Sequence, residues 1–131
     1  MTALNECVMI VDDESLNVMW LTALLEDMGK TVCGEAASAE EAVRVAEANR
    51  PSLILMDLRL DGDGDGVDAT LEIYERVGSQ VIFVTGSTDP VALRRIESVN
   101  PVTVLTKPVS VRKLMEAVDQ AFRGRPDGSV H

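Results

Sequence analysis

The sequence predicts a doubly wound α/β fold of three layers, in which helices cover both faces of a five-stranded parallel sheet with strand order 2-1-3-4-5. Short apolar runs alternate five times with longer amphipathic stretches, as in parallel strands joined by helices. The chain has 131 residues, of which 46% are hydrophobic, and this suits a single core. We expect one domain over residues 1–123 and a disordered polar tail over residues 124–131.

The expected strands are the apolar runs at residues 7–11, 31–36, 53–57, 80–85 and 102–106. The expected helices have apolar residues three or four positions apart and cover residues 15–28, 39–48, 66–77, 90–97 and 110–122. In such a sheet the carboxyl ends of the strands share one edge, and the functional crevice is expected there.

Residues typical of helix ends stand at these boundaries. Gly29 follows the first helix as a C-terminal stop, and Ser38 with Glu41 forms a capping box at the start of the second. Asp89 precedes a first-turn proline at the fourth helix, and Ser110 can cap the fifth. The local chemistry therefore agrees with the alternation of strands and helices.

The chain is acidic, with 22 Asp and Glu residues against 12 Lys and Arg residues and a formal net charge of −10. This excess would repel phosphate backbones and anionic lipids, so neither nucleic acid nor a membrane is expected as a direct partner. The longest apolar runs span about four residues, whereas a membrane-spanning helix needs roughly twenty. The first six residues lack the features of a signal peptide, so we expect a cytoplasmic protein.

The chain has two cysteines, Cys7 and Cys33. In a reducing compartment they are expected to be small buried hydrophobic residues. No CxxC spacing is present to lower a thiol pKa, so a redox role is not expected for the pair.

Polar residues stand at the carboxyl ends of four expected strands. From the first to the fifth strand they are Asp12, Asp13, Glu14, Asp57, Thr85 and Lys107. Carboxylates from neighbouring strands repel one another unless a cation lies among them, and hard oxygen ligands suit Mg²⁺. The sequence therefore predicts a metal site at this edge, for which Mn²⁺ can substitute for Mg²⁺.

A phosphoryl group would complete the shell of such an ion, because Mg²⁺ in proteins favours one or two carboxylates together with phosphate oxygens. Asp57 is then the candidate acceptor, which would form an acyl phosphate. Lys107 as a point charge and Thr85 as a hydroxyl donor would bind the oxygens that the metal does not. Taken singly, each residue has an ordinary explanation as a helix cap, a strand residue or a solvated charge. Their combination favours a functional site.

These residues, in this order, resemble the receiver domain of two-component response regulators, over the segment from about Cys7 to Phe122. The resemblance implies a flavodoxin-like fold. The segments that carry it are Val11-Asp12-Asp13-Glu14, Leu55-Met56-Asp57-Leu58, Val84-Thr85-Gly86-Ser87 and Leu105-Thr106-Lys107-Pro108.

The resemblance implies a role for each matching position. Asp57 would be the phosphoacceptor, with Thr85 and Lys107 holding the phosphoryl oxygens. The metal ligands would be Asp13 and Asp57 directly, Asp12 through water, and the backbone carbonyl of Arg59. The peptide bond before Pro108 would be cis, which a tertiary amide permits at modest cost.

Three departures from the family pattern concern the switch. The segment Asp61–Gly66 is one residue longer than usual and lacks the usual proline, and the position commonly held by Tyr or Phe is Val104. The segment from Phe83 resembles an atypical Phe-x-Thr-Gly subgroup, but Thr88 replaces the tyrosine found there. The remaining candidates for the switch are a shift of the Thr85 hydroxyl and a reordering of Gly86 and Ser87 through to the start of the fourth helix.

Other functions remain open at this point. Residues 61–72 match the EF-hand pattern, with acids at alternating positions and Glu72 at the twelfth, but a buried strand precedes this loop where an EF-hand needs a helix. An aspartyl-nucleophile phosphatase would want an acid two residues after Asp57, where the chain has Arg59. A pseudo-receiver that only binds a partner is a further alternative.

The interpretation favoured by the sequence is a stand-alone receiver that takes a phosphoryl group on Asp57 from a histidine kinase or a histidine phosphotransfer protein. It would signal by contact with a downstream protein and would be no enzyme beyond assisting its own phosphorylation and dephosphorylation. The donor histidine must be external, because the chain's one histidine is His131 in the expected tail. Arg94, Arg95, Arg112 and Lys113 lie on the family's usual docking face, around the fourth and fifth helices.

Overall fold

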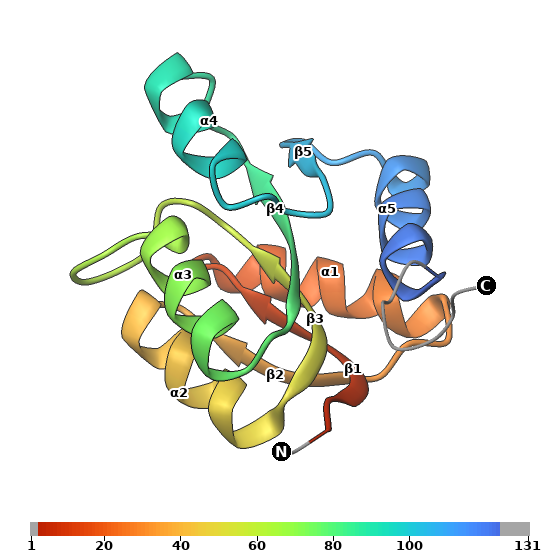
Figure 1. Ribbon diagram of the computed structural model, residues 1–131. Helices are drawn as coiled ribbons and strands as arrows, with labels where there is room; N and C mark the ends of the chain where they lie inside the picture. Colours follow the sequence, from red (N-terminus) through yellow and green to blue (C-terminus); the bar gives the residue numbers. More distant parts are fainter. Residues whose placement is uncertain (1–2, 124–131) are drawn as a thin grey trace.

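The computed structural model describes residues 3–123, and the predicted tail with His131 lies outside the described residues. Five parallel strands form one sheet in the order β2-β1-β3-β4-β5, as the sequence predicts (Figure 1). The strands are β1 Asn5–Val11, β2 Val32–Ala36, β3 Pro51–Met56, β4 Gln80–Thr85 and β5 Val104–Thr106. The predicted doubly wound fold is confirmed.

Helices cover both faces of the sheet, and an apolar cluster fills the space on each side. The helices are α1 Ser15–Asp27, α2 Ala39–Asn49, α3 Gly66–Arg76, α4 Pro90–Glu97 and α5 Val111–Arg123. One cluster joins the sheet to α1 and α5, and the other joins it to α2, α3 and α4. β3 is buried along its whole length, because it lies in the middle of the sheet with a helical layer on each face.

The predicted boundaries agree with the structure to within two residues at most ends. β1 begins two residues early because Asn5 donates its backbone N–H to the carbonyl of Arg50, 2.7 Å away. Most of the capping predictions are confirmed. At the start of α2, Ser38 accepts a hydrogen bond from the N–H of Glu41 at 3.1 Å, but the Glu41 carboxylate accepts from the N–H of Ala37 and not from that of Ser38, so the predicted capping box is only half formed. Asp89 and Ser110 accept backbone hydrogen bonds at the starts of α4 and α5, and Gly29 has a positive φ of 80° after α1.

The strand register brings the carboxyl ends of β1 and β3 side by side. Val11 pairs with Met56, and the backbone N–H of Asp57 donates to the carbonyl of Val11 at 2.9 Å. Between β4 and β5, the N–H of Lys107 donates to the carbonyl of Thr85 at 2.9 Å. The residues that follow these four strands therefore share one edge of the sheet, as expected of parallel strands.

The acidic loop before α3 forms a helix cap. The Asp65 carboxylate accepts hydrogen bonds from the backbone N–H groups of Val67 and Asp68, each at 3.0 Å, and the Asp68 carboxylate accepts one from the N–H of Asp65 at 2.9 Å. This is a reciprocal capping box. The cap engages Oδ1 of Asp65, a carboxylate that the EF-hand alternative needs as a calcium ligand. The strand β3, and no helix, precedes the loop, so the structure argues against that alternative.

The cap predicts how stability depends on pH. Burial raises the pKa of Asp65, but hydrogen bonds from Arg95 and the backbone outweigh burial, and the pKa lies below its ordinary value of 3.8. A carboxylate of lowered pKa stabilises the fold above its unfolded pKa, and this contribution is lost as the pH falls through the folded pKa. We expect Asp65→Ala to cost about 1 kcal/mol at pH 7 in urea unfolding. The deficit should shrink below pH 3.8, whereas Asp65→Asn, which keeps a capping side chain, should cost less. A deficit that stays constant down to pH 3 would contradict this origin.

Cys7 and Cys33 form a disulfide between β1 and β2, so the expectation of two unpaired hydrophobic residues is wrong. That expectation used the compartment and the CxxC spacing, and the spacing concerns only cysteines close in sequence. These two are separated by 26 positions and meet because the strand order places β2 beside β1. The predicted order already made the two strands neighbours, and this was the available signal.

Reduction of the disulfide should destabilise the protein. Closing a loop of this length is expected to contribute about 3 kcal/mol, mainly by restricting the unfolded chain. We therefore expect a reductant to lower the midpoint of thermal unfolding, and the double variant Cys7→Ser/Cys33→Ser to unfold at the lower midpoint with or without reductant. Equal midpoints for the wild type in both conditions would show that the crosslink contributes nothing.

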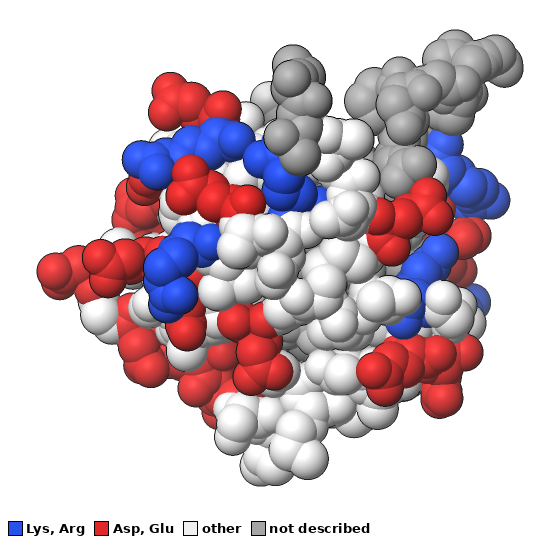
Figure 2. Space-filling view, turned by 90° about the horizontal axis from the view of Figure 1, so that it is seen from below, with Lys and Arg blue, Asp and Glu red and all other residues white. Residues whose placement is uncertain are grey.

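Charged side chains are numerous on the face of the molecule drawn in Figure 2. Figure 2 shows the face that holds the amino ends of the strands, where acidic side chains outnumber basic ones and surround a neutral centre. Among the described residues, no helix is both long enough and apolar enough to cross a lipid bilayer.

Candidate functional site

Three carboxylates meet at the carboxyl edge of the sheet. Asp12 and Asp13 follow β1 and Asp57 follows β3, and each offers an oxygen within 4.8 Å of the others. Asp12 and Asp57 are buried, with 4% and 8% exposure, whereas Asp13 is open to solvent. The structure therefore brings together the three acidic side chains predicted as metal ligands. Their hard oxygens fit Mg²⁺.

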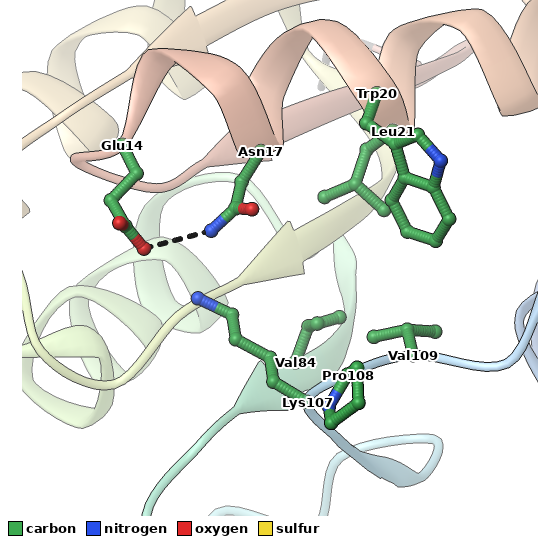
Figure 3. Close-up of a pocket in the computed structure, with 8 residues that line it drawn as sticks. All are labelled: Glu14, Asn17, Trp20, Leu21, Val84, Lys107, Pro108 and Val109. Carbon is green, nitrogen blue, oxygen red and sulfur yellow. Dashed lines mark hydrogen bonds between the residues drawn. The ribbon is translucent and has the colours of Figure 1, made fainter.

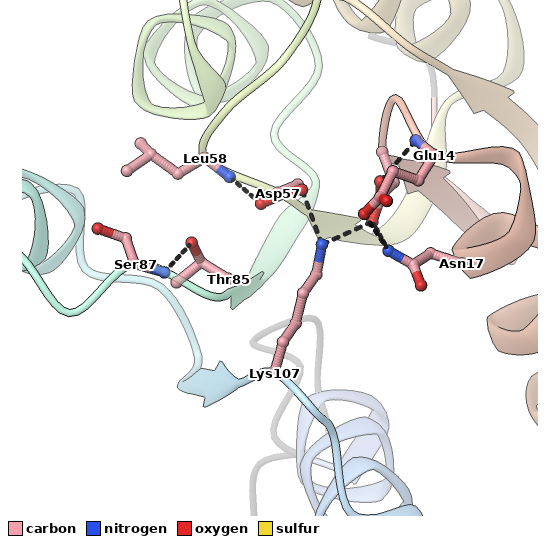
Figure 4. A network of polar contacts seen from close by, with 8 residues as sticks. Glu14, Asn17, Asp57, Leu58, Thr85, Ser87 and Lys107 are labelled. Carbon is pink, nitrogen blue, oxygen red and sulfur yellow. Dashed lines mark hydrogen bonds and ion pairs between the residues drawn. The ribbon is translucent and has the colours of Figure 1, made fainter.

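Lys107 joins the two buried carboxylates (Figure 4). Its ammonium Nζ lies 3.1 Å from Asp12 Oδ2 and 2.9 Å from Asp57 Oδ2. The other oxygens of both acids accept backbone hydrogen bonds, from Glu14 N–H to Asp12 at 2.9 Å and from Leu58 N–H to Asp57 at 2.7 Å. Both buried carboxylates are thus held in fixed orientations.

The electrostatics of the site reflect this shared cation. Burial raises the pKa of Asp57 above its usual value, and the hydrogen bond and charge of Lys107 only partly oppose that effect. Burial lowers the pKa of Lys107, but its bonds to Asp57 and Asp12 outweigh burial and raise it overall. Burial and repulsion from Asp61 and Asp12 raise the pKa of Asp13. One ammonium does not neutralise three acids, so the site retains negative charge that a divalent cation would offset.

The predicted hydroxyl and loop positions border the same opening, whereas Pro108 lines a neighbouring depression. Thr85 is 2% exposed, and its Oγ1 accepts a hydrogen bond from the N–H of Ser87 at 3.2 Å. The peptide bond between Lys107 and Pro108 is cis, as the resemblance implies. An open depression of about 640 Å³ lies above the acids and is lined by Asp13, Glu14, Asp57, Arg59, Thr85, Gly86, Ser87, Thr88, Asp89 and Lys107.

Val104 lies away from this opening. It pairs with Phe83 across β4 and β5 and packs, partly buried, on the apolar cluster that includes α4. Its short side chain places no aromatic ring beside Thr85. A switch that works without an aromatic side chain at this position stays a prediction.

A second depression adjoins the site on the other side of Lys107 (Figure 3). It measures about 500 Å³ and lies between α1 and the chain that follows β5. Its walls are mainly apolar and include Trp20, Leu21, Val84 and Val109. Trp20 is 43% exposed and is the only tryptophan of the chain, so its fluorescence can report on this region.

Asn17 belongs to the site although the sequence reasoning missed it. Its side-chain amide donates to Glu14 Oε1 at 2.9 Å and reaches Asp12 Oδ2 at 3.4 Å. Glu14 is thus held at the start of α1. The signal was available, because Asn17 stands three residues after Glu14 in the first helical turn and residues so spaced are neighbours on a helix.

The lysine contact can be tested by titration. We expect Lys107→Met to raise the pKa of Asp57 further, because burial remains while the opposing charge and hydrogen bond are lost. An acid of raised pKa costs stability once ionised, so the variant should regain stability as the pH falls through the pKa of Asp57. Carboxyl NMR titration measures the shift, and Lys113→Met on the exposed surface of α5 is the matched control. An unchanged Asp57 titration in Lys107→Met would refute the contact.

Comparison with known proteins decides the family. The family model named response regulator receiver domain matches residues 8–119 of this chain, which include every residue of the site. The chain belongs to the response regulator receiver family. Receiver domains are signalling phosphoacceptors, and the acids, hydroxyl and lysine of this chain stand in the order that the resemblance indicates.

Curated relatives are identical to this chain at about a third of the aligned positions. The transcriptional regulatory protein PdtaR of Mycobacterium tuberculosis is 32% identical over 114 residues, which are 87% of this chain and 55% of PdtaR. The phyllosphere-induced regulator PhyR of Methylorubrum extorquens is 34% identical over 116 residues, which are 88% of this chain and 43% of PhyR. The chain thus spans about half the length of these relatives, and the stand-alone arrangement stays a prediction.

Solved structures confirm the fold. The signal receiver domain of a modulated diguanylate cyclase from Desulfovibrio desulfuricans G20 superposes with a TM-score of 0.84 at 35% identity, covering 92% of this chain and 95% of that one. A CheY-like receiver domain protein from Methanospirillum hungatei JF-1 gives a TM-score of 0.79 at 27% identity, covering 90% and 93%. The flavodoxin-like receiver fold therefore extends over nearly the whole chain.

Proposed function

We propose that this receiver accepts a phosphoryl group on Asp57 from the phosphohistidine of a histidine kinase or a histidine phosphotransfer protein. The observation that carries the proposal is the placement of Lys107 between two buried carboxylates, beside an open acidic depression. Thr85 stands on the same rim. The change would reach a downstream protein by contact.

In this reaction an oxygen of the Asp57 carboxylate forms a bond to phosphorus while the bond from phosphorus to the donor nitrogen breaks. The imidazole leaves with the electron pair of that bond and takes a proton from solvent. Lys107 contacts Asp57 and can form an ion pair with the phosphoryl oxygens once the group is transferred. The Thr85 hydroxyl can donate a hydrogen bond to a phosphoryl oxygen. Catalysis consists of positioning and charge stabilisation, as is general for phosphoryl transfer.

The donor set supports a bound Mg²⁺ ion. Asp12, Asp13 and Asp57 would hold it, with Asp12 acting through water and the carbonyl of Arg59 adding a backbone ligand. When bound, the ion would offset charge on the acids and the phosphoryl oxygens. Mn²⁺, which also takes oxygen ligands, would substitute for it.

The proposal predicts a single phosphorylated residue. Incubation with a small-molecule phosphodonor and Mg²⁺ should add one phosphoryl group, stable in acid and labile in base, as mass spectrometry measures. Asp57→Asn should abolish the adduct, and omission of Mg²⁺ should reduce it strongly. Asp63→Asn is the matched control, because Asp63 is an exposed acid of the adjacent loop outside the cluster. It should be phosphorylated like the wild type.

Two outcomes would overturn the proposal. An adduct that persists in Asp57→Asn would place the acceptor elsewhere. No adduct on the wild type with any donor, despite an Mg²⁺-dependent change in Trp20 fluorescence, would identify a binding module that has lost the chemistry. Heating with Ca²⁺ adds a check on the loop, since stabilisation by Ca²⁺ that survives Asp57→Asn would place a cation in residues 61–72.

A further inference from the structure

The helix α4 is held to the rest of the protein by a small apolar contact. Ile96 is its one buried residue, and Ala92 and Leu93 pack only partly against the sheet. A hollow of about 460 Å³ separates its first turns from the loop that follows Asp57. In Figure 1, α4 projects beyond the strand ends. This helix therefore has room to move.

One polar contact bridges that hollow. The guanidinium of Arg95 binds both carboxylate oxygens of Asp65, and it also lies 3.6 Å from Asp68 Oδ1. The contact runs from the last turn of α4 to the N-cap and first turn of α3. The hydrogen bond and charge of Asp65 raise the pKa of Arg95, in agreement with a formed ion pair.

Asp65 is itself fixed to the acceptor. As the cap of α3 it precedes Gly66, whose N–H donates to the carbonyl of Leu58 at 2.8 Å. A Cβ atom at Gly66 would lie 2.1 Å from the backbone oxygen of Asp57, so α3 begins directly against the acceptor residue. Arg95 is therefore connected to Asp57 through the α3 cap, by a route separate from the segment between Thr85 and α4.

We propose that Arg95 is a positioning residue, whose ion pair with Asp65 holds α4 in the place it occupies in the unphosphorylated protein. This inference rests on the proposed phosphorylation of Asp57. A phosphoryl group there attracts the Thr85 hydroxyl and the segment Gly86–Asp89, which leads directly into α4. Movement of the first turn of α4 then works against the ion pair. The pair gives this receiver a restraint on α4 that does not depend on an aromatic side chain at Val104.

The size of the effect follows from exposure. The Arg95 side chain is 44% exposed and that of Asp65 is 28% exposed, so solvent screens their attraction. Ion pairs of this kind shift an equilibrium by up to about fivefold. Removing the pair should therefore shift the position of α4 several-fold and leave the fold intact. By linkage, a ligand that favours the shifted position should bind more tightly by the same factor.

The test compares Arg95→Ala with Arg94→Ala, a neighbouring exposed arginine of the same helix. The probe is the beryllium trifluoride anion with Mg²⁺, a non-covalent analogue of the phosphoryl group. In Arg95→Ala we expect faster amide hydrogen exchange in α4 without the probe, and up to about fivefold tighter binding of the probe, followed by Trp20 fluorescence. Arg94→Ala should match the wild type in both measurements.

Charge-preserving and cap-preserving variants separate positioning from general destabilisation. Arg95→Lys should restore most of the α4 protection because it keeps the charge. Asp65→Asn, which keeps a capping side chain on α3, should behave like Arg95→Ala. High salt should accelerate α4 exchange in the wild type and leave it unchanged in Arg95→Ala.

Unchanged α4 exchange in Arg95→Ala would overturn the inference, as would equal changes in Arg94→Ala. These outcomes are distinct from failure of the proposed function. If the wild type neither binds the probe nor forms a phosphoryl adduct, the proposed function fails, while exchange without the probe still reports whether Arg95 holds α4. If the adduct forms but α4 behaves alike in the wild type and in Arg95→Ala, only the inference fails.

Discussion

The contact of one lysine with two buried carboxylates is the interaction on which the chemistry of this protein depends. Asp12 and Asp57 are almost inaccessible to water, and ionised carboxylates in such positions are costly unless a cation and hydrogen bonds compensate. Lys107, which follows β5, supplies the cation, and backbone N–H groups donate hydrogen bonds to the other oxygen of each carboxylate. The acids are thereby oriented before any ligand arrives. The residual negative charge, which Asp13 increases, favours a divalent cation.

The order of the strands brings the residues of this contact together. β1 and β3 are central neighbours, so the acids that follow them meet without a long side chain having to bridge a gap. β5 lies at the edge of the sheet, and the long side chain of Lys107, which follows it, reaches back to Asp57 and Asp12. β3 is buried on both faces, and this packing fixes the position of Asp57 at the end of the strand. The packing of two apolar layers thus sets distances of about 3 Å among charged atoms.

The remaining acidity has several origins. Asp65 and Asp68 cap α3 and form ion pairs with Arg95 of α4. Two acids of the segment that matches the EF-hand pattern therefore connect α3 to α4. Asp61 lies close enough to raise the pKa of Asp13 and so adds to the charge of the site. Acidic side chains on the face drawn in Figure 2 contribute to the net charge but do not belong to the cluster of Asp12, Asp13 and Asp57. A net charge of −10 therefore does not by itself locate a metal site.

The sequence by itself determined the alternation of strands and helices, because the apolar period and the residues at helix ends are local properties. It also determined which residues stand at the carboxyl edge, since parallel strands must end on the same side. The tertiary structure decided what depends on neighbours distant in the chain. The Cys7–Cys33 disulfide, the contacts of Lys107 with Asp12 and Asp57, and the pairing of Asp65 with Arg95 all depend on how side chains meet after folding. Local patterns specify elements and their order, whereas the contacts of a side chain are fixed only when packing has set the distances between elements.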